Sequence, residues 1–170
     1  MNDAPASGAP EHLPDDAPAA SDTPSRGILD TSTLILLGRI TDPTLLPAEP
    51  LITAVTLAEL SAGPLVASDQ GERAARQAHL QQAEADFDPL PFDAEAARAF
   101  GRVSASLRRA GRKRAARAYD AMIAAIAVAN DLPLYTCNAK DFSGIDELDV
   151  VTVPNPEDSP ATGTEAQTPA

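Results

Sequence analysis

Four short apolar runs, separated by longer stretches with helical spacing, place the strongest constraint on what this chain can fold into. The runs cover residues 27–29, 51–53, 132–136 and 150–153. Runs of this length, rich in Leu, Ile and Val, are typical of buried strands. Strands that alternate with helices predict an α/β protein whose central sheet is mainly parallel. Ligands bind such sheets outside the carboxyl ends of their strands.

The stretches between these runs carry helix signals. Apolar side chains recur at helical spacing, and Pro or Gly residues mark the ends. We expect helices over residues 34–40, 56–63, 69–85, 94–110 and 115–130. Asp93 is the expected cap of the fourth helix. Residues 87–92 contain two prolines, so an edge strand or an extended segment is expected there.

Both ends of the chain are rich in Pro and Ala and nearly devoid of large apolar side chains. Residues 1–25 contain five prolines and residues 154–170 contain four. Such segments cannot bury enough apolar surface to offset the entropy that is lost on ordering. We therefore expect two disordered tails around one folded domain, which covers residues 26–153 and has the size of a typical single domain.

The acidic net charge of −12 conceals a basic segment. The chain has 25 acids against 13 bases, and eight of the acids lie in the two tails, which leaves the expected domain only mildly acidic. Residues 98–117 contain eight Arg and Lys residues and no acid. A basic patch of this kind indicates a surface for nucleic acid. The alternative is a run of charges that only interacts with solvent.

The cysteine and histidine content narrows the chemistry. Cys137 is the only cysteine, which excludes an intrachain disulfide and favours a reducing compartment. The two histidines, His12 and His79, argue against a zinc site and against a Ser-His-Asp or Cys-His mechanism. No leader peptide and no apolar run near roughly 20 residues is visible, so we expect a cytoplasmic protein without a membrane segment.

Two acids stand where a parallel sheet would present them, and each also has a structural reading. Asp30 follows the first apolar run, either as a functional carboxylate or as the N-cap of the next helix, a place that Thr31 or Ser32 would fill equally well. Glu59 follows Thr56 at the spacing of a capping box. Taken alone, Glu59 favours the structural role.

Two further acids follow later in the chain. Asp120 opens an apolar helix and shares its face with small and apolar residues, which carries it toward the core. A carboxylate there needs a bound metal or a salt bridge, for which Arg117 is the alternative partner. Asn138 and Asp141 follow the strand over residues 133–136, in a pattern that also fits a turn or the start of a short helix.

Four motifs taken together resemble the VapC-type PIN-domain toxins. They are Ile28-Leu29-Asp30-Thr31-Ser32, Val55-Thr56-Leu57-Ala58-Glu59-Leu60, Asp120-Ala121-Met122-Ile123-Ala124-Ala125 and Leu134-Tyr135-Thr136-Cys137-Asn138-Ala139-Lys140-Asp141-Phe142. Their order and spacing are similar to that family over residues 27–153, and the two tails depart from it. The resemblance implies a three-layer α/β/α sandwich, an acidic pocket for Mg²⁺ or Mn²⁺, RNA cleavage, a small VapB-like antitoxin and a homodimer.

The resemblance also assigns roles to side chains. The acidic catalytic roles fall to Asp30, Glu59, Asp120 and Asp141. The metal would be held by Asp30, Asp120 and Asp141, while Glu59 would position or deprotonate the attacking water. The supporting polar groups would be Thr31, Ser32 and Asn138. Apart from the resemblance, the basic segment before the Asp120 helix predicts the bases that would hold the RNA backbone over the metal: Arg112, Lys113, Arg114 and Arg117.

The chemistry of the acids agrees with these roles. Crowded carboxylates repel one another unless a cation lies between them. Mg²⁺ and Mn²⁺ prefer carboxylate and water oxygens. Metal-assisted hydrolysis therefore suits a ribonuclease that has no catalytic histidine.

Two other classes remain as alternatives. One is another acidic-pocket phosphohydrolase, such as a haloacid-dehalogenase-like phosphatase, which would have a second Asp two residues after Asp30, where Ser32 stands. The other is a non-catalytic PIN-like module that binds RNA or protein. Such a module would not need all four acids.

Overall fold

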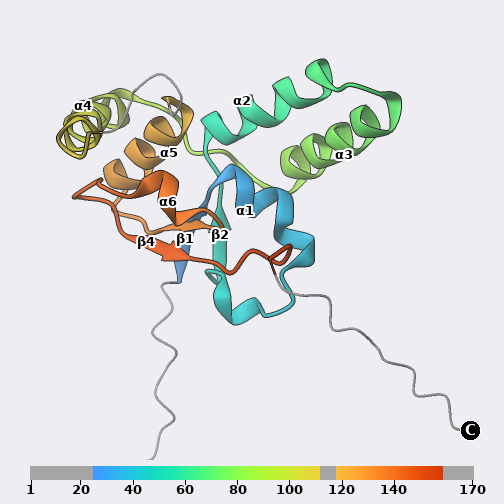
Figure 1. Cartoon of the computed structure of the whole chain (residues 1–170), viewed down its shortest axis with the longest axis horizontal. Coiled ribbons are helices and arrows are strands. Elements are labelled where there is room, and N and C mark those ends of the chain that lie inside the picture. Colours follow the sequence, from blue (N-terminus) through green and yellow to red (C-terminus); the bar gives the residue numbers. More distant parts are fainter. Residues whose placement is uncertain (1–24, 112–117, 159–170) are drawn as a thin grey trace, which may run out of the picture.

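The computed structural model describes residues 25–111 and 118–158. Within them, four strands form one sheet in the order β2-β1-β3-β4, and each neighbouring pair is parallel (Figure 1). The strands are β1 Arg26–Leu29, β2 Glu49–Leu51, β3 Leu134–Thr136 and β4 Val150–Thr152. The expected parallel sheet is confirmed, and its second strand begins two residues earlier than the sequence suggests.

The helices of the described ranges alternate with these strands. They are α1 Thr31–Leu36, α2 Ala54–Ala62, α3 Gln70–Asp86, α4 Ala94–Arg109, α5 Ala118–Ala129 and α6 Ala139–Phe142. Short 3-10 helices are η1 Leu37–Arg39, η2 Pro43–Leu45 and η3 Gly63–Val66. The five expected helices correspond to α1–α5, and the expected start of the fifth, at residue 115, lies outside the described residues.

Different elements cover the two faces of the sheet. Ile28 and Leu134 lie in a core cluster with buried residues of α4 and α5. Their sequence neighbours Leu29 and Tyr135 lie in a second cluster, with residues of α1 and η1. Successive side chains of a strand point to opposite faces, so β1 and β3 contribute to both clusters. The expected three-layer α/β/α sandwich is confirmed.

Helix α5 is buried on most of its circumference. Its buried residues are Ala121, Ile123, Ala124, Ala125, Ile126 and Ala127. A helix that is apolar all round belongs in the interior, and α5 shares its cluster with the sheet and with Ala96, Ala99 and Val103 of α4. The first turn of α5 therefore begins at the edge of the core, which is where Asp120 lies.

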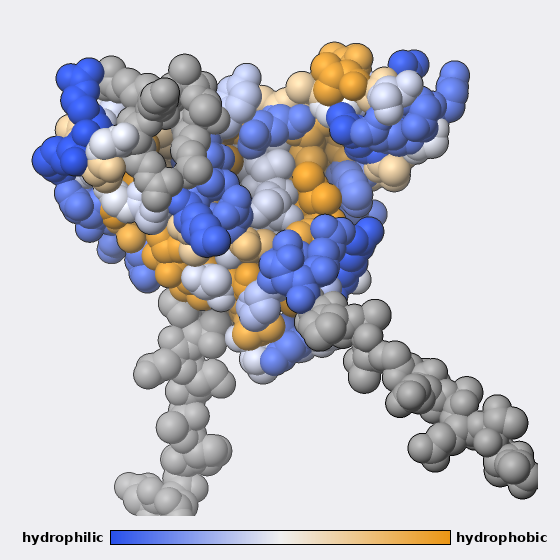
Figure 2. All heavy atoms as spheres, in the orientation of Figure 1, coloured by the Kyte–Doolittle hydropathy of each residue, from blue (hydrophilic) through white to orange (hydrophobic). Residues whose placement is uncertain are grey.

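Helices α2 and α3 lie side by side and project beyond the sheet (Figure 1). A third cluster, formed by Ile52, Leu60 and Ala83, joins this hairpin to the domain. At the tip of the hairpin, where η3 connects α2 to α3, Leu65 is 82% exposed and Val66 is 72% exposed. Figure 2 shows hydrophobic atoms at this tip. Most of α3 is exposed, because one face of a surface helix suffices to hold it.

Between α3 and α4 the chain is extended. Leu90 forms an isolated parallel bridge with Thr53, and its backbone N–H donates to the Ile52 carbonyl at 2.9 Å. The expectation of an extended segment is confirmed.

Beyond β4 the described chain continues to Asp158. It turns at Asn155, whose carbonyl accepts from the Asp158 N–H at 3.0 Å, and Glu157 forms an ion pair with Arg39. The expected tails otherwise lie outside the described residues and stay a prediction. In the ranges 25–111 and 118–158, no helix has the length and apolar character that a bilayer crossing requires.

Gly27 tests how tightly β1 fits against the second face of the sheet. A Cβ atom there would lie 2.4 Å from Cε2 of Tyr135, whose ring is fully buried. We expect Gly27→Ala to lower the free energy of unfolding by about 1–3 kcal/mol, because the ring must move. Gly38→Ala is the matched control, since a Cβ there meets nothing within 4 Å, and we expect a change below about 0.5 kcal/mol. Urea denaturation measures both, and equal losses would contradict this account.

Candidate active site

All four predicted acids line one cavity at the carboxyl edge of the sheet. This acidic cavity has a volume of about 290 Å³ and is lined by Asp30, Thr31, Ser32, Ile35, Glu59, Asp120, Ile123, Asn138 and Asp141. The structure thus brings together the seven side chains that the sequence analysis assigned as acidic or supporting groups. They come from the start of α1, from α2, from the first turn of α5 and from the region of α6. Their catalytic roles stay predictions.

The Asp30 carboxylate is held from two sides. Its Oδ1 accepts from the Thr33 backbone N–H at 2.8 Å, and the Ser32 hydroxyl donates to both of its oxygens. From β3, the Thr136 hydroxyl donates to Oδ2 at 2.8 Å. Asp30 is therefore the N-cap of α1, which confirms the structural reading of this residue, and Thr31 and Ser32 do not fill that place. Because a carboxylate has about four lone-pair sites, the capping role does not exclude a functional one.

Glu59 lies inside α2 and not at its start. The N-cap of α2 is Thr53, whose Oγ1 accepts from the Thr56 N–H at 3.0 Å. The capping-box reading of Thr56 and Glu59 is therefore wrong, because the helix begins before Thr56. The Glu59 carboxylate instead accepts a 2.5 Å hydrogen bond from the Thr31 hydroxyl. This contact ties α2 to α1 at the wall of the acidic cavity.

Asp120 lies in the first turn of α5 and is half-buried. It lines the cavity together with Ile123, one turn further along. The face that it shares with buried Ala124 and Ala127 is the one expected from the sequence. Arg117, its alternative partner, lies outside the described residues.

Asn138 and Asp141 belong to the short segment after β3. Asn138 occupies the N-cap position of α6, and its amide donates a hydrogen bond to the Asp141 carboxylate. The reading of this motif as the start of a short helix is confirmed. It coexists with the position of both side chains in the cavity wall.

The donor set of the acidic cavity consists of oxygens and one amide group. Hard divalent cations prefer such donors. Cys137 does not line the cavity, and burial raises the pKa of its thiol. Among the described residues, no group of three or more His, Cys, Asp or Glu side chains is arranged to bind a metal ion. Carboxylates without a cation repel one another, and Mg²⁺ keeps several waters while binding one or two carboxylates, so the residues fit such an ion.

Thr136 is a site residue that the sequence analysis missed. Its buried hydroxyl donates to Asp30 and accepts from the Asn138 N–H at 2.9 Å. The signal lies in the sheet register, because Leu29 pairs with Tyr135. The next residue of each strand, Asp30 and Thr136, therefore stands at the same edge.

The predicted RNA-binding bases lie outside the described residues, so their role stays a prediction. They are Arg112, Lys113, Arg114 and Arg117. Earlier in the same basic segment, Arg102 pairs with Glu147 at 2.8 Å and Arg109 pairs with Asp146 at 2.6 Å. The hydrogen bond from Arg109 lowers the pKa of Asp146, which keeps that pair charged at neutral pH. Part of the basic segment is thus matched by acids.

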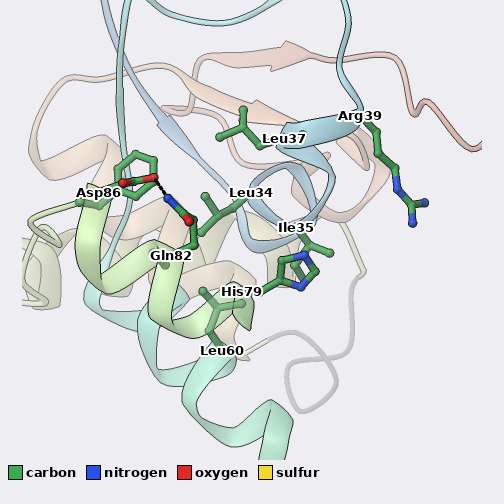
Figure 3. Close-up of a pocket in the computed structure, with 11 residues that line it drawn as sticks. Leu34, Ile35, Leu37, Arg39, Leu60, His79, Gln82 and Asp86 are labelled. Atoms are coloured by element: carbon green, nitrogen blue, oxygen red, sulfur yellow. Dashed lines mark hydrogen bonds between the residues drawn. The ribbon is translucent and has the colours of Figure 1, made fainter. Parts of the chain in front are cut away.

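Two further cavities border the acidic cavity along α1. The first, which we call the Arg76 cavity, measures about 240 Å³ and is lined by Thr31, Ile35, Glu59, Leu60, Gly63, Arg76 and His79. The second, the apolar cavity, measures about 490 Å³ and lies between α1, η1 and α3. Ile35 lines all three cavities. In Figure 3, Ile35 and His79 lie next to each other, whereas Arg39 points away.

Comparisons with known proteins place this architecture in a family. Residues 28–148 match the PIN domain family. The chain is 41% identical over 128 residues to Ribonuclease VapC5 of Mycobacterium tuberculosis. This alignment covers 74% of this chain and 92% of that protein. It is 31% identical over 130 residues to Ribonuclease VapC of Rickettsia bellii. This second alignment covers 75% of this chain and 96% of that protein.

A solved structure agrees with these relatives. It is the crystal structure of VapBC-5 from Mycobacterium tuberculosis, a member of the VapBC family of toxin–antitoxin systems. The match has a TM-score of 0.66 at 36% identity and covers 76% of this chain and 100% of that chain. The resemblance inferred from four short motifs is therefore confirmed, and the chain belongs to the VapC proteins of the PIN domain family.

Proposed function

We propose that this chain is a divalent-metal-dependent endoribonuclease that serves as the toxin of a toxin–antitoxin pair. The observation that carries the proposal is the acidic cavity, in which four carboxylates from separate segments of a VapC family member meet. Two relatives that cover most of this domain are named ribonucleases. A non-catalytic binding module has no use for this set of acids.

The residues of the acidic cavity have different roles in the proposed hydrolysis. Asp30, Asp120 and Asp141 would hold the cation, Asp141 either directly or through a water molecule, and the cation is Mg²⁺ in our proposal with Mn²⁺ as the alternative. A bound divalent cation lowers the pKa of a water molecule and polarises the scissile phosphate. Glu59 would position such a water and accept its proton. The Thr31 hydroxyl, which donates to Oε2 of Glu59, would hold this carboxylate in place for that role.

The partners of the chain follow from its family. VapBC-5, whose structure matches this domain, is a member of a family of toxin–antitoxin systems. We propose a VapB-like antitoxin that inhibits this chain and an RNA substrate held partly by Arg112, Lys113, Arg114 and Arg117. The homodimer implied by the resemblance stays an expectation, which light scattering of the purified chain would test.

Asp120→Asn tests the catalytic role of the acidic cavity. We expect the rate of RNA cleavage to fall at least about 100-fold, since metal binding and activation of water both depend on the carboxylate. Asp131→Asn is the matched control, because Asp131 lies beyond the far end of α5, and its φ of 52° is one that Asn tolerates. RNA cleavage and thermal melting are measured for both. Full activity in a folded Asp120→Asn protein would favour the binding module.

Thr31 tests the role of Glu59. Thr31→Val removes the hydroxyl that donates to Glu59 and should lower kcat about tenfold, the worth of a hydrogen bond to a charged group. Thr31→Ser keeps the hydroxyl and should stay within about twofold of the parent chain. Steady-state cleavage of a short RNA gives kcat and KM for both variants. Equal kcat values for the Val and Ser variants would remove Thr31 from the mechanism.

The metal itself is tested by removal and by titration. EDTA should abolish cleavage, and Mg²⁺ or Mn²⁺ should restore it, with the more effective ion identifying the cofactor. Titration calorimetry should detect cation uptake by the full chain and an affinity reduced about tenfold or more in Asp120→Asn. Cleavage that persists in EDTA would overturn the metal-dependent mechanism.

A further inference from the structure

The Arg76 cavity opens beside the acidic cavity and shares part of its wall. Thr31, Ile35 and Glu59 line both. The Thr31–Glu59 contact separates the two cavities, so a chain molecule that lies over the acidic cavity can reach the Arg76 cavity across this contact. The remaining wall of the Arg76 cavity comes from the α2–α3 hairpin, which contributes a cation, Arg76, and an imidazole, His79.

Arg76 is fixed on this wall by two hydrogen bonds. Its guanidinium donates to the Gly63 carbonyl at 2.9 Å and to Glu72 at 2.5 Å. Its stem runs over Gly63, where a Cβ would lie 3.4 Å from the Arg76 Cδ. A guanidinium carries five N–H donors, and these contacts use two of them. Arg76 is thus held in one orientation before any ligand arrives, which lowers the entropic cost of binding.

Glu72 keeps Arg76 in place. The backbone N–H and the hydroxyl of Ser68 both donate to Glu72 at 2.7 Å. These bonds, followed by the charge of Arg76, lower the pKa of Glu72. Glu72 therefore stays ionised at neutral pH, and the chain of contacts from Ser68 through Glu72 to Arg76 persists there.

Another part of the cavity lining suits a flat, weakly polar group. Ile35 is 42% exposed and lies next to the His79 ring (Figure 3). Histidine rings and apolar side chains are surfaces on which splayed RNA bases rest. The cavity therefore combines a fixed cation for a phosphate or ribose with a surface for a base.

We propose that the Arg76 cavity is a subsite for the nucleotide next to the scissile phosphate of the RNA. Arg76 contacts the phosphate or ribose of that nucleotide, and Ile35 and His79 contact its base. This inference rests on the proposed ribonuclease activity. A polyanion that approaches four carboxylates needs a cation nearby, and Arg76 lines the cavity that adjoins these carboxylates through Glu59. A neutral apolar peptide segment fits the neighbouring apolar cavity better than this charged one.

The test measures the binding of a short mixed-sequence single-stranded RNA to the full chain by fluorescence polarisation. It uses the Asp120→Asn background in Mg²⁺, so that binding is read separately from cleavage. Arg76→Gln should raise Kd about tenfold. It should also reduce the slope of log Kd against log salt by about 0.7, the loss of one phosphate contact.

Arg73→Gln is the matched control, because it removes the same charge from an exposed position of α3 outside the cavity. We expect its Kd to change less than about twofold and its salt slope to stay unchanged. If Arg76→Gln lowers the melting temperature, Arg76→Lys decides, since it keeps the charge and should keep the slope. Loss of the slope in Arg76→Lys as well, or equal effects of the two Gln variants, would overturn the proposal.

His79 tests the base contact. His79→Ala should weaken RNA binding about fivefold or more, whereas His79→Phe, which keeps a flat ring, should bind as the parent does. Equal losses in both variants would contradict a base in the cavity. If every variant binds RNA as the parent does while Arg76→Gln weakens capture of the VapB-like antitoxin, the cavity belongs to the protein partner and the nucleotide subsite is wrong. Absence of RNA binding in the parent background would also refute it, whereas RNA binding without cleavage by the unmodified chain would refute only the catalytic proposal.

Discussion

Hydrogen bonds to the Asp30 carboxylate join the start of α1 to the end of β3. The Thr33 N–H donates from α1, and the Thr136 hydroxyl donates from a strand that lies 106 residues further along the chain. The backbone supports the same junction, because the Asp30 N–H donates to the Tyr135 carbonyl at 3.1 Å. Parallel strands end at one edge of the sheet, so every other acid of the cavity reaches this point from a neighbouring crossover. This junction therefore fixes the position of Asp30 in the wall of the acidic cavity.

The sequence predicted the parallel sheet, the long helices and the convergence of the acids, because apolar periodicity reports directly which faces are buried. It failed where local and distant partners compete for one group. Thr53 and Thr56 both suit a helix start, and only the path of the chain after Ile52 decides that Thr53 is the cap. Asp30 posed the same difficulty, because its capping bond is local whereas its bond from Thr136 depends on sheet register. Side-chain identity alone does not reveal that register.

Several bases of the described residues are paired with acids that lie outside the acidic cavity. Arg102 and Arg109 face acids of the segment before β4, and Arg26 faces Glu49 at 3.3 Å. Such exposed pairs add little to stability. Their consequence is electrostatic, because these bases are paired with acids that do not line the acidic cavity, where four carboxylates form a local negative centre. A cation is what allows a phosphodiester to approach that centre.

The α2–α3 hairpin is attached to the domain through its own small cluster of Ile52, Leu60 and Ala83. Arg76 and His79 belong to α3, whereas Asp30, Asp120 and Asp141 belong to the sheet edge and to helices on its faces. The proposed RNA contacts of α3 and the proposed metal ligands thus lie on different elements, while Glu59 of α2 and Ile35 of α1 border both cavities. Under the proposed subsite, substitutions on the exposed face of α3 would alter the hold on RNA and leave the three aspartates that would bind the metal in place.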